Sequence, residues 1–188
     1  MSLSVGVCLR SHVITFPLPP NMLITRQIIY RLTKCGELCF GIFCTIIPGT
    51  GGDIESLGVG RPVETNREDG GISVLLGHVI STKTSTPVVT DASMAFPRDW
   101  QSEHPTPSEL GHHEDGRTIV LHSVAVAPQV QGRGLGRVLV LAYMQHMNGA
   151  GIADRLVLIA HDVSSFVPSC ILSYSNISYS IWFYGTKD

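Results

Sequence analysis

The spacing of apolar residues predicts a helix near the start of the chain and several strands after it. Ile24, Ile28 and Leu32 recur at helical spacing. Asn21 precedes them and belongs to a residue type that caps helices, so a helix is predicted over residues 21–34. Three further runs are predicted to be strands: 38–47 and 155–160, which are expected to be buried, and 72–83.

A further strand is predicted over residues 118–126, where both faces are apolar. Strict alternation puts one set of side chains on one face and the remainder on the other, and a strand buried on both faces lies in the middle of a sheet. The two predicted sets are Ile119, Leu121 and Ala125, and Val120, Val124 and Val126.

An amphipathic helix is predicted over residues 134–148, after a short glycine-rich turn. Glycines at 149 and 151 suit the end of that helix, because glycine readily adopts the left-handed conformation found there. The predicted buried face consists of Leu135, Val138, Leu139 and Ala142.

Two long segments show neither helical nor strand periodicity. Residues 48–71 are rich in glycine and carry scattered charges, which predicts an irregular excursion. Residues 84–116 are rich in Pro, Ser, Thr, His and acidic residues, with Trp100 as the one large apolar anchor. Long surface loops in compact domains often serve substrate binding.

Composition narrows the classes of function. The chain has 188 residues, of which 44% are hydrophobic, which suits one globular domain. A net charge of −2 offers no basic stripe for nucleic acid or for an acidic membrane, so we expect a small-molecule partner. The five cysteines form no C-x-x-C pair and are expected to be reduced and mostly buried. Arg10 and His12 interrupt the apolar start, which argues against a signal peptide and for a cytoplasmic protein.

The run Gln131-Gly132-Arg133-Gly134-Leu135-Gly136 lies between the predicted strand 118–126 and the predicted helix. Glycines allow the backbone to approach an anion, and the N–H groups of the first helical turn can hold a pyrophosphate. The glycines alone fit a turn without a ligand equally well. The spacing excludes a G-x-G-x-x-G dinucleotide motif, and the Gly-Lys-Ser/Thr of a P-loop is absent.

The same run matches R/Q-x-x-G-x-G/A, the acetyl-CoA signature of the GNAT superfamily. Its flanks at 121–126 and 151–162, and the upstream runs 30–39 and 76–80, resemble the arylalkylamine and polyamine N-acetyltransferases of fungi. The resemblance covers about residues 16–162. It implies an α/β GNAT fold with a mixed, mostly antiparallel central sheet flanked by helices, with a domain at 21–162, an irregular segment at 1–20 and an atypical tail at 163–188.

The resemblance also implies a co-substrate site for acetyl-CoA. In such enzymes the strand before the motif splays from its neighbour, and its backbone pairs with the pantetheine arm, while the motif surrounds the pyrophosphate. The second substrate is a small primary amine, an arylalkylamine or a polyamine. The implied acetyl-CoA residues are Ser123, Val124, Ala125, Val126, Gln131, Gly132, Arg133, Gly134, Leu135 and Gly136.

His122 is the candidate general base that deprotonates the amine. In the animal arylalkylamine enzymes two histidines lie two residues apart on this strand; His122 matches the second, and Val120 stands where the first would be. Taken without the family, a histidine in an apolar strand is more often a packed core residue. His112 and His113 lie beside acidic residues in the polar loop and are expected to be solvated, so no metal site is predicted.

The sequence departs from the family after Asp162. The family continues with a leucine-valine-proline-phenylalanine-tyrosine segment, whose tyrosine is the proposed acid for the departing thiolate, whereas residues 163–170 here carry no equivalent aromatic pair. We therefore expect the C-terminal part of the fold to be incomplete. One hypothesis is a translated intron, because every valine codon, including that of Val163, begins with GT as a splice donor does.

Two rival functions remain beside the small-amine acetyltransferase. One is an inactive isoform that binds CoA without turnover, which the departure after Asp162 favours. The other is an acetyltransferase of protein N-termini or lysines, which the similarity around His122 disfavours.

Overall fold

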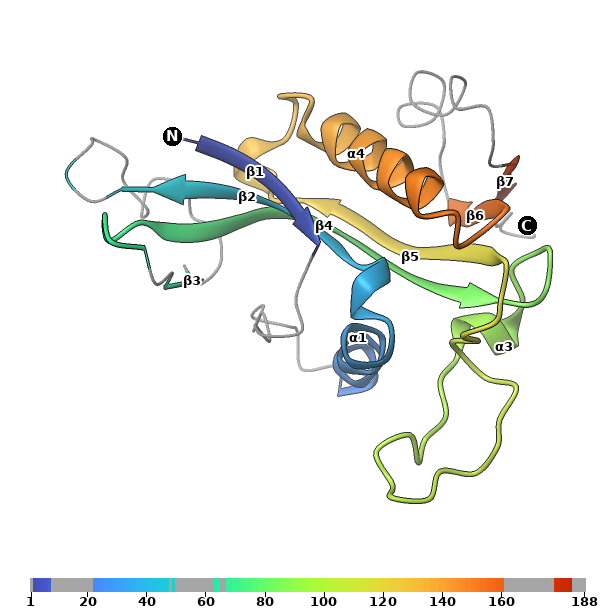
Figure 1. Ribbon diagram of the computed structural model, residues 1–188. Coiled ribbons are helices and arrows are strands. Elements are labelled where there is room, and N and C mark those ends of the chain that lie inside the picture. Colours follow the sequence, from blue (N-terminus) through green and yellow to red (C-terminus); the bar gives the residue numbers. More distant parts are fainter. Residues whose placement is uncertain are drawn as a thin grey trace, which may run out of the picture.

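The described residues of the protein contain one seven-stranded sheet. The computed structural model describes residues 2–7, 22–47, 49, 63–64, 67–160 and 178–183. The strand order is β1-β2-β4-β5-β6-β7, with β3 paired to β4 (Figure 1). The strands are β1 (Ser2–Val7), β2 (Phe40–Ile46), β3 (Val63–Glu64), β4 (Ile72–Thr84), β5 (Thr118–Val126), β6 (Arg155–Ala160) and β7 (Ser178–Phe183).

The sheet is mixed and mostly antiparallel, as predicted. Strand β2 pairs antiparallel with β1 and β4, and β4 pairs antiparallel with β3 and β5. Strand β6 runs parallel to both β5 and β7. The connection from β5 to β6 contains a helix, as a parallel pair of strands requires. The α/β fold class predicted from the sequence is therefore confirmed.

Helices cover both faces of the sheet. Helix α1 (Met22–Lys34) lies against one face and α4 (Leu135–Ala150) against the other (Figure 1). Both helix predictions are confirmed to within two residues, although Asn21, the predicted cap of α1, lies outside the described residues. Short 3-10 helices at Gly36–Leu38 and Pro128–Val130 lead into β2 and toward α4 respectively.

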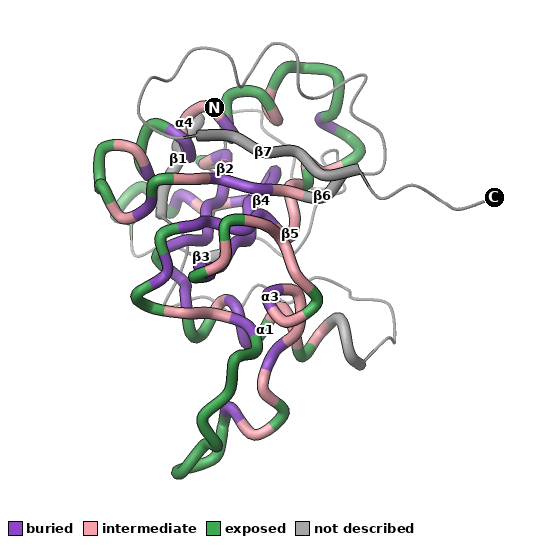
Figure 2. Tube along the Cα trace, turned by 90° about the vertical axis from the view of Figure 1, so that its right-hand side faces the viewer, coloured by how far each residue is buried: buried purple, intermediate pink, exposed green. Residues whose placement is uncertain are grey.

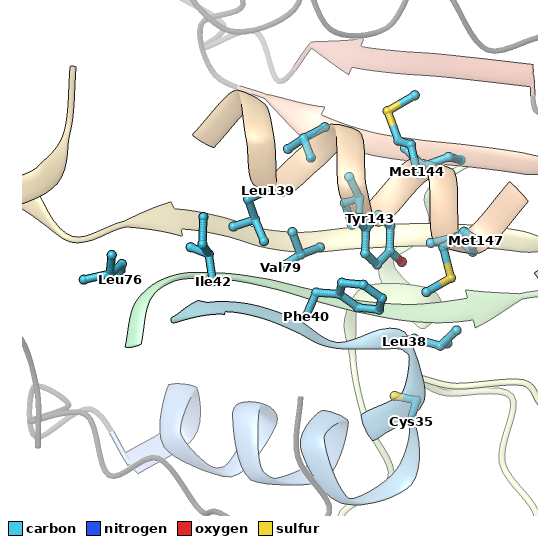
Figure 3. Packing of buried hydrophobic residues seen from close by; sticks show 14 of the residues in the cluster. Cys35, Leu38, Phe40, Ile42, Leu76, Val79, Leu139, Tyr143, Met144 and Met147 are labelled. Carbon is cyan, nitrogen blue, oxygen red and sulfur yellow. The ribbon is translucent and has the colours of Figure 1, made fainter. Parts of the chain in front are cut away.

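The main core lies between α4 and the sheet. Tyr143 packs edge-on against Phe40 with ring centroids 5.2 Å apart (Figure 3). The hydroxyl of Tyr143 lies 2.7 Å from Ser81 Oγ on β4. One residue that was predicted on the buried face of α4 is not buried, because Val138 is 49% exposed. The buried face of α4 is turned further around the helix, onto Leu139, Val140, Tyr143, Met144 and Met147.

Strand β5 lies between β4 and β6, which confirms its predicted place inside the sheet. The predicted division of its side chains between two faces is wrong. Val124 and Val126 pack into the same core as Ile119 and Leu121, whereas Ala125 is exposed. The cause is a β-bulge: Ile80 pairs with Ser123 and Ser81 pairs with Leu121, so His122 is an extra residue that reverses the alternation.

The polar segment after β4 folds onto α1 through an aromatic cluster. Trp100 is a buried anchor, with its ring 5.5 Å from that of Tyr30, but it is not the one large anchor that was predicted, because Phe96 is buried too and lies 5.6 Å from the same tyrosine. A short helix, α3 (Asp91–Met94), was missed by the periodicity analysis; the side chains of Thr90 and Ser93 cap it reciprocally. Residues 101–110 are exposed throughout (Figure 2).

The ends of the chain contribute strands outside the predicted domain at 21–162. Strand β1 pairs with β2 at one edge of the sheet, and β7 pairs with β6 at the other. The rest of the predicted N-terminal segment and tail, including residues 163–170, lies outside the described residues. Cys35, Cys39 and Cys44 are free and buried, as expected for them. In the described part of the chain, no helix is long and apolar enough to cross a membrane.

Candidate functional site

Strands β5 and β6 separate halfway along β5. Their pairing runs from Thr118 with Arg155 to Leu121 with Leu158, and the described residues give no pairing between these strands beyond that point. Strand β6 continues its pairing with β7 to Ala160, while residues 123–126 of β5 continue theirs with β4 alone. The extra residue His122 lies where the separation begins, and a bulge increases the local twist and bends a strand.

The separated part of β5 offers an edge to an extended ligand. Ser123, Val124 and Val126 are half-buried and Ala125 is exposed. Backbone groups on the side facing β6 are free of ladder bonds among the described residues, and an extended chain can bind such groups as an added strand would. This is where the sequence resemblance expects pantetheine.

The glycine-rich turn is tied to the end of this edge. Gln131 Nε2 donates a hydrogen bond of 2.8 Å to the carbonyl oxygen of Val126. Gly132 and Gly134 have φ values of 74° and 78°, a left-handed conformation that side chains disfavour. A Cβ added at either glycine would meet no atom within 4 Å, so the backbone there borders open space. The turn thus presents bare backbone beside the β5 edge.

The N-terminus of α4 forms the end of this site. Gly134 occupies the cap position and has no side chain to accept from the first-turn N–H groups, and the first turn carries no acidic residue. Arg133 and Arg137 are both exposed beside it. Uncapped N–H groups, the helix dipole and two guanidinium groups favour an anion. The arrangement brings together all the residues that the sequence predicted for acetyl-CoA.

A charge placed at Gly134 tests this anion site. We expect Gly134→Asp to weaken CoA binding at least about tenfold, because a carboxylate would stand where the uncapped N–H groups meet phosphate. Gly134→Asn is the matched control, since asparagine tolerates the same left-handed conformation without charge. Calorimetric titration with CoA measures the difference. Equal affinities in the two folded variants would contradict the assignment.

On the α1 face of the sheet, four polar side chains form two hydrogen-bonded pairs. His122 Nε2 lies 2.8 Å from Thr82 Oγ1, and His78 Nε2 lies 2.9 Å from Ser123 Oγ. The bulge puts His122 and Ser123 on the same face, which strict alternation would forbid. Of these four, the sequence predicted only His122 and Ser123 as site residues; Thr82 and His78 were missed, because β4 contains several other polar residues and nothing in its sequence marks these two.

The surroundings of His122 keep its ring neutral. Burial, followed by the charge of Arg31, lowers the pKa of His122 to about 3. Nδ1 is buried and is the one such side-chain nitrogen or oxygen without a partner among the described residues. A buried imidazole nitrogen without a partner is costly, so a proton donor that reached this atom would be stabilised there.

The depressed pKa of His122 predicts acid sensitivity. The imidazole of the unfolded chain binds a proton near pH 6.5, whereas the folded one does so only near pH 3. Stability is therefore fully present above about pH 6.5 and is lost as the pH falls through this window. Between pH 7 and pH 5 we expect the wild type to lose about 1–2 kcal/mol more unfolding free energy than His122→Gln. Urea unfolding at both pH values measures this; equal losses would contradict it.

A second polar cluster joins the 84–116 segment to β4. His112 is not solvated as predicted, because its side chain is only 7% exposed. Its Nδ1 accepts from the backbone N–H of Lys83 at 3.1 Å, so a neutral ring carries its proton on Nε2 and donates to Glu114 at 3.0 Å. His113 Nε2 donates to the Glu109 carbonyl at 3.1 Å.

Ligand atoms of Glu37, His112 and Glu114 lie within 4.8 Å of one another, which raises the question of a metal. A metal at Nε2 of His112 would have to displace the proton that the Lys83 backbone bond places there. Lys83 Nζ also lies 3.6 Å from Glu114, so a cation already neutralises that carboxylate. The geometry favours an ion-pair network over a metal site.

Comparison with known proteins supports the family suggested by the sequence. Residues 93–166 match the model of the Acetyltransferase (GNAT) family, and this segment contains β5, the glycine-rich turn, α4 and β6. A mycothiol acetyltransferase of a Nocardioides species is 33% identical over 63 residues, which are 34% of this chain and 21% of that protein. The chain therefore spans about a fifth of the length of that relative.

A solved structure also resembles the chain. It is the loading GNATL domain of CurA from Lyngbya majuscula, with a TM-score of 0.44 and 16% identity over 76% of this chain and 54% of that one. The family-model match, rather than this distant likeness, supports a GNAT acetyltransferase for the segment that holds the candidate site.

Proposed function

We propose that the chain is an acetyl-CoA-dependent N-acetyltransferase that acts on a primary amine of the arylalkylamine or polyamine type. The observation that carries the proposal is the separation of β5 from β6 beside the uncapped N-terminus of α4. It offers a strand-like edge for the pantetheine arm and an anion site for the pyrophosphate in one continuous surface. The family-model match over the same residues supports it.

In this proposal each part of the site binds one part of acetyl-CoA. The backbone of Ser123, Val124, Ala125 and Val126 binds the pantetheine amides. Gln131, Gly132, Arg133, Gly134, Leu135 and Gly136 surround the pyrophosphate through their N–H groups, with Arg133 adding charge. The thioester then lies near the bulge, because the β5 edge leads from the turn back to His122. The amine approaches from the α1 face.

The reaction is a direct acyl transfer. The amine nitrogen attacks the thioester carbon, a C–N bond forms, the C–S bond breaks, and one proton leaves the nitrogen. A CoA thiolate departs readily near neutral pH, since thiol pKa values are roughly 8.5. Much of the rate comes from holding the two reactants in line. The remaining task for the protein is to accept the proton.

His122 is the proposed acceptor of that proton. Its low pKa makes it a weak base toward a free alkylammonium, whose pKa is roughly 10. The same nitrogen becomes far more acidic once it is bonded to the thioester carbon, so a neutral imidazole suffices at that stage. Thr82 holds Nε2 and orients the ring. Thr82 on the neighbouring strand thereby takes the place of the first histidine of the animal arylalkylamine enzymes, where this chain has Val120.

Removal of the imidazole tests this role. We expect His122→Ala to lower kcat/KM by about tenfold to a thousandfold, with a smaller loss at high pH, where hydroxide can accept the proton of the bonded nitrogen in place of the imidazole. The matched control is His104→Ala, because His104 is exposed in the 84–116 segment. Initial rates of thiol release from pH 6 to pH 9 measure both. A loss that does not change with pH would indicate a packing role instead.

The activity itself is tested with a panel of acceptors. Serotonin, tryptamine, spermidine and a histone peptide, each with acetyl-CoA, separate the small-amine reading from protein acetylation. Calorimetric binding of acetyl-CoA without thiol release for any acceptor would favour the alternative, an isoform that binds CoA without turnover.

The proposed site of action is the cytoplasm. The buried, free cysteines Cys35, Cys39 and Cys44 support it, because thiols stay reduced there.

A further inference from the structure

Ser123 follows His122 in β5 and is the first residue of the separated edge that pairs with β4. The last pair of β5 with β6 is Leu121 with Leu158, and Ser123 pairs with Ile80 of β4 two residues further on. Ser123 is half-buried, so part of its surface stays accessible beside this edge. The bulge puts the side chains of His122 and Ser123 on the same face, and consecutive Cα atoms are about 3.8 Å apart. A small reacting group at one of these residues therefore lies close to the other.

The Ser123 hydroxyl is held by a histidine on the neighbouring strand. Its Oγ lies 2.9 Å from His78 Nε2. His78 is half-buried, and burial lowers the pKa of its imidazole, so the ring is neutral at pH 7. A neutral imidazole that carries its proton on Nε2 donates to Ser123 Oγ, and the serine then directs its own proton to another acceptor. A hydroxyl held in this way is a hydrogen-bond donor of fixed position.

The proposed acyl transfer develops negative charge on the carbonyl oxygen of the thioester. When the amine attacks the thioester carbon, an electron pair of the C=O bond moves onto this oxygen, and it returns as the C–S bond breaks. The roles proposed for His122 and for the glycine-rich turn concern the departing proton and the pyrophosphate. Donors of fixed position at such an oxyanion are usually the largest electrostatic contribution to catalysis. The carbonyl oxygen therefore needs a donor of its own.

We propose that the Ser123 hydroxyl donates a hydrogen bond to the carbonyl oxygen of the acetyl-CoA thioester, and that His78 is the positioning residue that orients this hydroxyl. The inference rests on the proposed acetyltransferase function and adds a catalytic residue to it. In that complex the pantetheine pairs with the β5 edge, so the thioester comes to the start of the edge, where Ser123 lies. No proton passes through the serine: its hydrogen bond strengthens as the oxygen becomes negative, while the proton of the amine leaves to His122.

The tautomer of His78 tests the orientation of the hydroxyl. With the proton on Nδ1 instead, Ser123 would donate to Nε2 and would resemble a nucleophile activated by a base. Nitrogen NMR of the histidine rings distinguishes the two forms, and the spectrum of His78→Gln assigns the signals. We expect Nε2 of His78 to carry the proton at pH 7. An unprotonated Nε2 would overturn the proposal.

Removal of the hydroxyl tests the catalytic role. We expect Ser123→Ala to lower kcat about tenfold to a hundredfold and to leave the affinity for acetyl-CoA within about twofold of the wild-type value, because the backbone of residue 123 binds the pantetheine. Ser73→Ala is the matched control, since Ser73 is half-buried at the start of β4, where it pairs with β2 and β3. A loss confined to KM, or an equal loss in the control, would contradict the role.

Two substitutions of His78 separate its hydrogen bond from its packing. Glutamine carries an N–H donor at about the reach of the imidazole Nε2, whereas leucine carries none. We expect His78→Leu to lower kcat about threefold to thirtyfold and His78→Gln to retain most of the wild-type value. In the Ser123→Ala background, His78→Leu should add no further loss of kcat, because both residues act through one hydroxyl. Equal losses in the leucine and glutamine variants would show that His78 does not act as a donor.

The stretching frequency of the bound thioester carbonyl makes the test independent of turnover. A hydrogen bond to the carbonyl oxygen weakens the C=O bond and lowers this frequency. With acetyl-CoA that is isotope-labelled at the acetyl carbonyl carbon, infrared spectra at saturation should show a lower frequency in the wild type than in Ser123→Ala. Calorimetric binding of acetyl-CoA to both proteins shows that the variant is folded.

Equal carbonyl frequencies in the two complexes would overturn the Ser123 donor and leave the proposed function standing. If acetyl-CoA binds but no amine releases thiol, the proposed function fails, and the infrared comparison still decides on Ser123. A wild type that does not bind acetyl-CoA would contradict both.

Discussion

The candidate site depends on one extra residue in β5. His122 has no register partner on β4, and this single insertion has two effects. It turns Val124 and Val126 toward the α4 core, although alternation from Leu121 would direct them away, and it coincides with the point where β5 leaves β6. A bulge bends the strand that carries it and increases the local twist, which favours this departure of β5 from β6.

The bulge also lies between the anion site on the α4 side of the sheet and His122 on the α1 side. Toward α4 the edge leads to the glycine-rich turn, where uncapped N–H groups and exposed arginines favour an anion. Toward α1 it presents His122 beside Thr82, in the field of a buried arginine. The proposed reaction needs a phosphorylated co-substrate and an amine to meet, and residue 122 is where the two surfaces adjoin.

Much of this architecture could be predicted from local patterns. Strand β5 begins and ends at the predicted residues, and the glycine-rich turn and α4 follow as expected, because periodicity and glycine placement are local signals. The bulge could not be predicted, since a period-two pattern contains no sign of an inserted residue, and both side-chain faces were therefore assigned wrongly beyond Leu121. The burial of His112 was missed for another reason: its partner, the Lys83 backbone, is distant in sequence. The burial of Arg31 could not be predicted either, because a helical arginine is ordinarily exposed.

The central claim is that acetyl-CoA lies along the separated edge of β5 and on the N-terminus of α4. Hydrogen exchange of individual backbone amides, with and without CoA, tests it most directly. The account predicts slower exchange at amides of residues 123–126 that face β6 and at the first-turn amides of Leu135, Gly136 and Arg137, with little change in β2. Protection confined to other elements, at CoA concentrations that saturate binding, would contradict it.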